Sequence, residues 1–341
     1  MTTSVSDFDY DLPKDRIAQS PIYPREEAKL MVLDRKNGTI QNFHVADLPK
    51  FFRKEDVVVL NNTKVFHARL HGQIQGKIVE LFLIRPQSDN TWLALGKPGK
   101  KFTLGTTIAI AKDFSAVVQE RYPDGTFSVI LNETKETIIE KANIYGDVPI
   151  PPYIKKITKD SDYQTIYAKY NGSVAAPTAG FHFSKPLLST LKKIGVTILE
   201  ITLHVGIGTF MPIKTQTIES HEMHSEWVNL PENIAETINK AKKNKQRIIA
   251  IGTTTVRTLE GVAALNNGIL KKYQGDINLF ITPGFTFNIV DAMLTNFHLP
   301  KSTLIVLVSA FAGRKNVLNA YQVAVNNNYR FYSFGDAMLI I

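Results

Sequence analysis

The chain has 341 residues, 44% of them hydrophobic, and its 40 Lys and Arg against 31 Asp and Glu leave a formal net charge of +9. This length and hydrophobic content predict a globular protein of two domains, and the basic balance favours an anionic partner, either nucleic acid or a membrane surface. The lack of cysteine excludes disulfides, thiolate metal sites and a cysteine nucleophile. The acidic N-terminal stretch argues against a signal peptide, and the apolar run 304–312 is too short for a membrane span. These features indicate a cytoplasmic protein.

The first 65 residues predict an extended entry into a larger fold. We expect a short helical stretch at 14–19, then strands at 29–34 and 39–43 joined by a turn at Asn37 and Gly38. The run DVVVL at 56–60 is β-branched and apolar, which is typical of a strand buried in a sheet.

Residues 66–148 form a block of short alternating or β-branched runs separated by Gly, Pro, Asn and Asp. In chain order the runs are ARLHGQI, KIVELFLI, TWLALG, TIAIA, FSAVVQERY and TFSVIL. This texture predicts a small antiparallel barrel or sandwich.

After residue 149 helical and strand-like segments alternate, which favours an α/β domain. We expect helices at 185–194 and 232–243 and strands at 196–204, 247–251 and 303–310. Because the run 56–60 suits the same sheet, we predict the α/β class with one discontinuous α/β catalytic domain, residues 1–65 and 149–341. A small antiparallel β-barrel domain, residues 66–148, would be inserted into it.

In the segment RIIAIGTTTVRTLE, an apolar strand is followed by a glycine and then by the start of a helix. A helix N-terminus offers unpaired N–H groups and a positive dipole end, so Thr253 and Thr254 can hold a phosphate or carboxylate, or can simply cap the helix. Arg257, one turn further on, can face the same anion or pair with Glu260. The spacing matches neither the P-loop nor the dinucleotide-binding motif.

Two further turns carry small residues that can admit a ligand or can reflect tight packing. In TLHVGIGTF, Gly206 and Gly208 allow close backbone approach beside Thr209. In VAAPTAGFHF, Thr178 and Gly180 precede His182.

Histidines gather in or beside these turns, and histidine exchanges protons most readily near neutral pH. The run HEMHSEW brings His221, His224 and Glu226 together for acid–base work or for a metal, although the spacing is not that of the HExxH motif. The run VDAMLTNFHLPKST places Asp291 and His298 in what we expect to be a loop that faces a pocket. Each histidine can equally be a hydrogen-bonded structural residue.

These segments together resemble the S-adenosylmethionine:tRNA ribosyltransferase-isomerase family of queuosine biosynthesis. The resemblance runs from Lys14 to Leu339 and rests on KDRIAQ, VLNNTKV, ARLHG, PPYI, YQTIYA, VAAPTAGFHF, TLHVGIGTF, HEMHSEW, IGTTTVRTLE, PGF, TNFHLPKSTL and YRFYSFGDAML, in this order. The family typically has aspartate and arginine at the positions of Asn62 and Lys64 and often tyrosine at that of Phe285. A carboxylate or bidentate guanidinium role is therefore not carried over to Asn62 and Lys64, although Lys64 keeps the charge.

The resemblance implies an α/β fold with an inserted barrel and an enzyme that consumes S-adenosylmethionine as a substrate, without a metal or other cofactor. The ribosyl part would be transferred and isomerised onto 7-aminomethyl-7-deazaguanine at the tRNA wobble position, giving epoxyqueuosine and releasing adenine and methionine. We expect a monomer that has no membrane partner.

The residue roles that we expect follow from the motifs. Proton transfer is assigned to His182, His224, Glu226, Asp291 and His298. Substrate binding is assigned to Thr178, Gly180, Gly206, Gly208, Thr209, Thr253, Thr254 and Arg257, and binding of the tRNA backbone to Arg16, Lys64, Arg69 and Arg330.

Three alternatives remain open on the sequence. An RNA-binding module without catalysis would release no adenine. A metal-dependent hydrolase using His221 and His224 would contain stoichiometric metal and lose activity with a chelator. A methyltransferase would share the donor but release S-adenosylhomocysteine.

Overall fold

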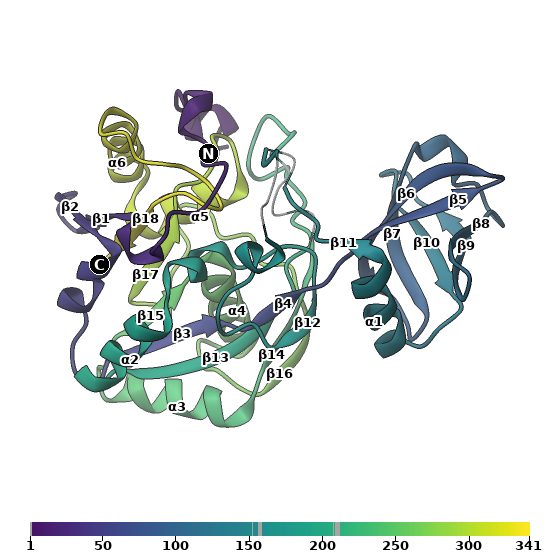
Figure 1. Ribbon diagram of the computed structural model, residues 1–341. Coiled ribbons are helices and arrows are strands. Elements are labelled where there is room, and N and C mark those ends of the chain that lie inside the picture. Colours follow the sequence, from purple (N-terminus) through teal and green to yellow (C-terminus); the bar gives the residue numbers. More distant parts are fainter. Residues whose placement is uncertain (1, 152, 156–158, 207, 209–211) are drawn as a thin grey trace. The chain divides into compact units, whose positions relative to one another are not determined.

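The computed structural model describes the chain except residues 1, 152, 156–158, 207 and 209–211 (Figure 1). The described chain divides into two compact units, which are treated separately below. One comprises Met1–Thr63, Pro152–Ala168 and Pro177–Ile341, and the other comprises Lys64–Pro151 and Lys169–Ala176.

The larger unit is built on a nine-stranded mixed sheet in the order β16-β14-β13-β3-β15-β17-β18-β1-β2 (Figure 1). Its central strands read as continuous apolar runs, as expected for strands buried on both faces. The strands are β1 (Lys29–Leu33), β2 (Ile40–His44), β3 (Val57–Asn61), β13 (Thr197–Leu203), β14 (Glu226–Leu230), β15 (Ile248–Ile251), β16 (Tyr273–Ile277), β17 (Ala292–Asn296) and β18 (Ala337–Ile340).

Four neighbouring strands of this sheet run parallel and therefore end at the same edge. Strand β3 pairs in parallel with β13 on one side and with β15 on the other, and β15 pairs in parallel with β17. Strand β18 runs antiparallel to β17 and parallel to β1. The loops after β3, β13, β15 and β17 consequently come together at one edge, where open α/β sheets bind ligands.

Five α-helices belong to this unit: α2 (Lys185–Ile194), α3 (Glu232–Lys243), α4 (Thr253–Leu265), α5 (Thr303–Ala312) and α6 (Arg314–Asn326). The sequence predicted α2 and α3 with these bounds. Ser184 caps α2 by accepting a hydrogen bond from the Leu187 N–H at 3.1 Å, and Gly195 ends it in the left-handed region at φ +95°. Leu187 and Leu191 then pack onto one face of the sheet with β3 and β15.

Two local predictions were wrong. The run 303–310, predicted as a strand, forms helix α5, which is capped by Ser302 and is buried on nearly all sides. A fully buried helix has the same continuous apolar pattern as a buried strand, so hydrophobic periodicity cannot separate the two. The helical stretch predicted at 14–19 is only a single 3-10 turn at Lys14–Arg16.

The smaller unit contains a closed antiparallel barrel of six strands, as the sequence predicted. The order is β5-β6-β7-β10-β9-β8, and a pairing of Gln73 with Ala109 joins β8 back to β5. The strands are β5 (Arg69–Ile74), β6 (Lys77–Pro86), β7 (Thr91–Lys97), β8 (Thr107–Ala111), β9 (Phe114–Arg121) and β10 (Phe127–Leu131). Alternate side chains of the strands fill its core, among them Trp92 and Phe127. Phe102, which follows a 3-10 turn between β7 and β8, and helix α1 (Lys135–Tyr145), through Ile138 and Ala142, complete it.

The smaller unit includes a segment that the sequence had assigned to the α/β domain. Residues Lys169–Ala176 cluster with the barrel because Val174 is part of the barrel core and because the Phe66 N–H donates to the Ser173 carbonyl at 3.2 Å. The short strands β12 (Tyr170–Ser173) and β4 (Thr63–Val65) pair in a two-stranded sheet, and β11 (Gly146–Asp147) pairs with β5. In the described part of the chain, no helix has the length and apolar character needed to cross a bilayer.

Candidate functional site

Asn61, at the end of β3, is hydrogen-bonded to three segments at the edge of the sheet where the parallel strands end. Its side-chain oxygen accepts from the N–H groups of Thr63 and Leu203 at 3.1 and 3.0 Å, and its amide nitrogen donates to the Leu203 carbonyl at 3.0 Å and to the Thr254 hydroxyl at 3.3 Å. Because all of this is buried, each bond replaces a lost contact with water. The ends of β3 and β13 and the first turn of α4 are thus held in a fixed relationship.

Asn62 fits its surroundings as an amide. Its nitrogen donates to a Glu200 carboxylate oxygen at 3.1 Å, and its oxygen accepts from the Thr202 hydroxyl at 2.8 Å. An aspartate here could not donate to Glu200 and would place two carboxylates together. The amide therefore has a packing role in this chain, next to the strand-end edge.

His204, which follows β13, is oriented by two contacts. Its Nδ1 lies 2.8 Å from the Thr63 hydroxyl, and its ring stacks on Trp227 at a centroid distance of 4.9 Å and an interplanar angle of 13°. The sequence pointed to His204 as one of the clustered histidines but gave it no role. Its position beside Thr63 places it among the residues of the edge.

Glu226 and Arg257 form a buried ion pair next to Gly206, the first glycine of the turn that follows β13. One Glu226 oxygen accepts from the Gly206 N–H at 3.1 Å and the other from the Arg257 guanidinium, which also donates to the Leu279 carbonyl at 3.2 Å. The sequence had left open a pairing of Arg257 with Glu260, but the Glu260 carboxylate instead accepts three backbone N–H groups, those of residues 288–290. The pair fixes the turn that starts at Gly206.

His224 lies against the second glycine of that turn. A Cβ built on Gly208 would come within 2.5 Å of the His224 ring, whereas one on Gly206 would meet nothing within 4 Å. Glycine at 208 thus allows the turn and an exposed imidazole to be in direct contact. Thr209, assigned to substrate binding from the sequence, lies outside the described residues.

The start of α4 lies at the same edge, directly after β15. Gly252 precedes it at φ +87°, and a Cβ there would be 3.5 Å from the Ala179 side chain, which places the turn Thr178–His182 close by. No side chain caps this helix end among the described residues: Thr255 donates back to the Ile251 carbonyl at 2.7 Å, and Thr254 binds Asn61. Thr253 and Thr254 therefore lie near the turn Thr178–His182, and the substrate-binding role assigned to both segments from the sequence stays a prediction.

His298 follows β17 and is deeply buried. Its Nε2 lies 2.9 Å from the Thr295 hydroxyl, its N–H donates to the Tyr321 hydroxyl at 3.1 Å, and its carbonyl accepts from Tyr10. Burial lowers the pKa of His298 to about 3, so the ring is neutral at physiological pH. It is held as a neutral hydrogen-bonding group.

His182 lines a pocket with Arg25 and Arg330. Burial, followed by the positive charge of Arg25, lowers the pKa of His182 to about 4, although a hydrogen bond with the Asn296 side chain acts in the opposite direction. The sequence gave Arg330 to the tRNA and His182 to proton transfer, but the structure places both around one pocket. Arg25 was not found from the sequence, where only its position directly after Pro24 distinguishes it.

Asp291 is not brought to this site. It precedes β17, so it lies at the opposite edge of the sheet, where its carboxylate pairs with Lys242 at 2.7 Å and accepts from the Ile248 N–H at 2.8 Å. The strand β17 separates it from His298, because residues 292–296 that were expected in a loop run through the sheet. We therefore leave Asp291 out of the candidate site.

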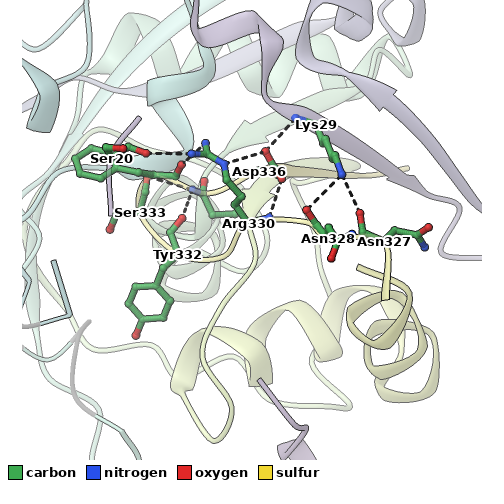
Figure 2. Close-up of polar contacts among 10 residues, drawn as sticks. Ser20, Lys29, Asn327, Asn328, Arg330, Tyr332, Ser333 and Asp336 are labelled. Carbon is green, nitrogen blue, oxygen red and sulfur yellow. Dashed lines mark hydrogen bonds and ion pairs between the residues drawn. The ribbon is translucent and has the colours of Figure 1, made fainter. Parts of the chain in front are cut away.

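The three arginines and one lysine proposed for tRNA binding are divided between the two units. The Arg330 guanidinium is engaged internally, donating to the Ser20 carbonyl at 3.0 Å and to the Phe334 carbonyl at 2.7 Å (Figure 2). Arg16 lies beside it in the larger unit, through the hydrogen bond from the Phe331 N–H to its carbonyl at 2.8 Å. Lys64 and Arg69 belong to the barrel unit, where Lys64 is exposed and Arg69 lies 3.9 Å from Glu80.

With this geometry in place, comparison with known proteins defines the class. The chain belongs to the queuosine biosynthesis protein family, whose profile matches residues 5–340. A relative from Caldanaerobacter subterraneus is 46% identical across 98% of this chain and 99% of its own, and one from Carboxydothermus hydrogenoformans is 47% identical across 99% of both.

Both relatives are named S-adenosylmethionine:tRNA ribosyltransferase-isomerase. The crystal structure of an S-adenosylmethionine tRNA ribosyltransferase from Thermotoga maritima is similar over 98% of this chain and all of that one, with a TM-score of 0.58 and 36% identity.

Proposed function

We propose that this protein is an S-adenosylmethionine:tRNA ribosyltransferase-isomerase, which transfers and isomerises the ribosyl part of S-adenosylmethionine onto 7-aminomethyl-7-deazaguanine at the tRNA wobble position. The products are epoxyqueuosine-tRNA, adenine and methionine. The observation that carries the proposal is the likeness to relatives of this name over 98–99% of the chain. The strand-end site, with its glycine turn, helix N-terminus and histidines, supports it.

The chemistry needs one base and one acid. The sulfonium acidifies the ribose C5′ hydrogens, a base takes one of these protons, adenine leaves with a proton from an acid, the aminomethyl nitrogen attacks and methionine departs. We propose His224 for proton transfer, because it is exposed and touches the glycine turn. Replacing a group that transfers a proton typically slows a reaction by about a hundredfold to ten-thousandfold, which is the loss expected for His224→Gln.

Buried residues of the site are proposed as positioning residues. Glu226 and Arg257 neutralise each other and hold the Gly206 turn, so neither is offered as the base. His298, which follows β17, supplies a neutral ring that forms a hydrogen bond with Thr295. Thr253 and Thr254 in the first turn of α4 are proposed to face the nucleoside or an anionic substrate group.

The tRNA is proposed to bind through phosphate contacts that position the anticodon, with the wobble base splayed into the site. Lys64, Arg69 and Arg16 are the basic residues offered for these contacts, and the net charge of +9 supports an RNA partner. We propose that the protein acts as a monomer in the cytoplasm and uses no cofactor besides the S-adenosylmethionine that it consumes.

One experiment separates this proposal from its alternatives. Purified protein is incubated with S-adenosylmethionine and tRNA carrying 7-aminomethyl-7-deazaguanine, and free adenine and the mass of the modified nucleoside are measured. Adenine released in step with epoxyqueuosine is expected. S-Adenosylhomocysteine would instead indicate a methyltransferase, and folded protein that binds tRNA but forms no product would indicate a binding module.

A metal-dependent hydrolase is tested with a chelator in the same assay. The described residues contain no group of three or more His, Asp or Glu side chains arranged to hold a metal ion. His221 packs edge-on against Phe280 at 5.4 Å, which gives that ring a packing role. Activity that disappears with chelator and returns with zinc or manganese would overturn the proposed reaction.

A further inference from the structure

A small pocket in the larger unit combines two guanidinium groups with a buried imidazole. It is lined by Arg25, His182 and Arg330 and has apolar walls that include Ile22, Phe181 and Phe334. The residues at the start of α4, where the sequence placed an anionic substrate group, are not among those that line the pocket. Its charges raise the question of what it binds.

Arg25 is held rigidly without a counter-ion. Its guanidinium lies over the rings of Tyr23, Phe181 and Phe334 at 5.0, 5.4 and 5.9 Å. It donates to the Asp162 carbonyl at 3.2 Å and to the Tyr23 hydroxyl at 3.4 Å, and that hydroxyl in turn donates to the Asp162 carboxylate. Among the described residues, no carboxylate forms an ion pair with it. Aromatic faces leave its in-plane N–H groups available for an anion.

The Arg330 guanidinium is also held by contacts with its surroundings. The Ser20 and Phe334 carbonyls hold its two terminal nitrogens, and its Nε lies 3.8 Å from the buried Asp336 carboxylate (Figure 2). Asp336 also accepts from the N–H groups of Lys29 and Arg330 at 3.0 and 2.7 Å. Burial lowers the pKa of Arg330, the Asp336 carboxylate raises it, and the positive charge of Arg25 lowers it to a smaller extent.

His182 adds an unsatisfied polar atom to this arrangement. The side chain is only 4% exposed, and its Nε2 has no hydrogen bond within 3.5 Å among the described residues, although the neighbouring Asn296 side chain raises the pKa of the ring by hydrogen bonding. A buried polar atom that is poorly hydrogen-bonded is destabilising, because it has lost its contact with water. The charge of Arg330 is balanced in part by Asp336, whereas Arg25 has no ion pair among the described residues, so an anion between the two guanidiniums would stabilise Arg25 and would accept a hydrogen bond from the His182 ring.

We propose that this pocket binds a single oxyanion, held between the guanidiniums of Arg25 and Arg330 with the neutral His182 ring alongside. The inference rests on the proposed function for the source of the oxyanion, which is either the carboxylate of S-adenosylmethionine or a phosphodiester of the tRNA. Both present the same chemistry to the pocket, and guanidinium groups recognise both.

The test uses two variants and a matched control. Arg25→Gln removes one charge, and Ile22→Glu places a carboxylate of the chain itself at the pocket. Arg53→Gln removes an equal charge at an exposed position just before β3, which is the far end of the parallel strands. Arg25→Lys, which keeps the charge, should recover part of any loss.

Binding of S-adenosylmethionine, of its decarboxylated analogue and of tRNA is measured for each folded protein. If the carboxylate is the ligand, Arg25→Gln and Ile22→Glu weaken S-adenosylmethionine binding about tenfold to a hundredfold, as expected for a charge-assisted hydrogen bond, and leave the decarboxylated analogue unaffected. If a phosphodiester is the ligand, tRNA binding weakens instead, and the slope of log affinity against log salt falls by about one.

The effect of inorganic sulfate on thermal stability tests the pocket independently of the proposed function. Sulfate should raise the melting temperature of the wild type and of Arg53→Gln more than that of Arg25→Gln or Ile22→Glu. That result would support the site even if the protein released no adenine. If both pocket variants fold and match the wild type in all three affinities and in the sulfate response, the proposal is overturned. Should Arg25→Gln fail to fold, Ile22→Glu decides.

Discussion

The Glu226 carboxylate and the Arg257 guanidinium form an ion pair almost completely withdrawn from solvent, with each side chain 4% exposed. One partner comes from β14 and the other from α4, and the carboxylate also holds the Gly206 N–H. The pair therefore joins a sheet strand, a helix and the glycine turn.

Removing one charge of this pair should destabilise the protein strongly. Glu226→Gln leaves the Arg257 guanidinium buried without its counter-ion, which typically costs about 3–5 kcal/mol. We expect that loss in the free energy of unfolding measured with urea. The double variant Glu226→Gln/Arg257→Gln should be less destabilised than the sum of the two single variants, and simple additivity would contradict the coupling.

The glycine turn offers a matched pair of substitutions. Gly208→Ala places a Cβ against the His224 ring, whereas Gly206→Ala meets nothing and keeps the N–H that binds Glu226. We expect Gly208→Ala to lower kcat/KM for tRNA modification by displacing His224, and Gly206→Ala to leave it near the wild-type value. Equal effects of the two, with both proteins folded, would argue against a contact between the turn and His224 in catalysis.

The two buried neutral histidines make stability depend on pH. The pKa values of His182 and His298 are lowered from 6.5 to about 4 and about 3, so below pH 6.5 the unfolded chain binds protons that the folded protein does not. The unfolding free energy should therefore fall as the pH is lowered from 6.5 towards 4, by at most about 1.4 kcal/mol per pH unit for each histidine. His298→Gln should reduce this slope, and an unchanged slope in urea titrations would contradict it.

Asp291→Asn tests the placement of that residue at the far edge of the sheet. The substitution breaks the ion pair with Lys242 but keeps an oxygen that can accept from the Ile248 N–H. We expect a modest loss of stability and a kcat close to that of the wild type. A large loss of kcat in a stably folded variant would return Asp291 to the list of catalytic candidates.

The sequence predicted the fold well wherever local pattern and burial agree. The barrel runs, α2, α3 and the strands β1, β3 and β15 follow from alternation, caps and β-branched content. Helix α5 was missed because burial on all sides removes the amphipathic signal. The segment 169–176 was misplaced because its membership depends on pairing with residues distant in sequence.

The site was predicted only in outline. The sequence identified the segments that meet at the strand ends, since loops after parallel strands share an edge. It could not show that Asp291 enters β17 from the other side, that Arg257 pairs with Glu226 rather than Glu260, or that Arg25 faces Arg330. Each of these relationships is set by long-range packing, which leaves no local pattern.

The place of β18 in the sheet has a consequence for how the chain folds during synthesis. This strand, at residues 337–340, lies between β17 and β1, although β1 is made some three hundred residues earlier. The β1–β2 hairpin must therefore wait, with one edge of β1 unpaired, until residues 337–340 have been synthesised and have left the ribosome. Exposed edges of this kind favour aggregation, so chaperone binding to the nascent chain should be concentrated on residues 29–44.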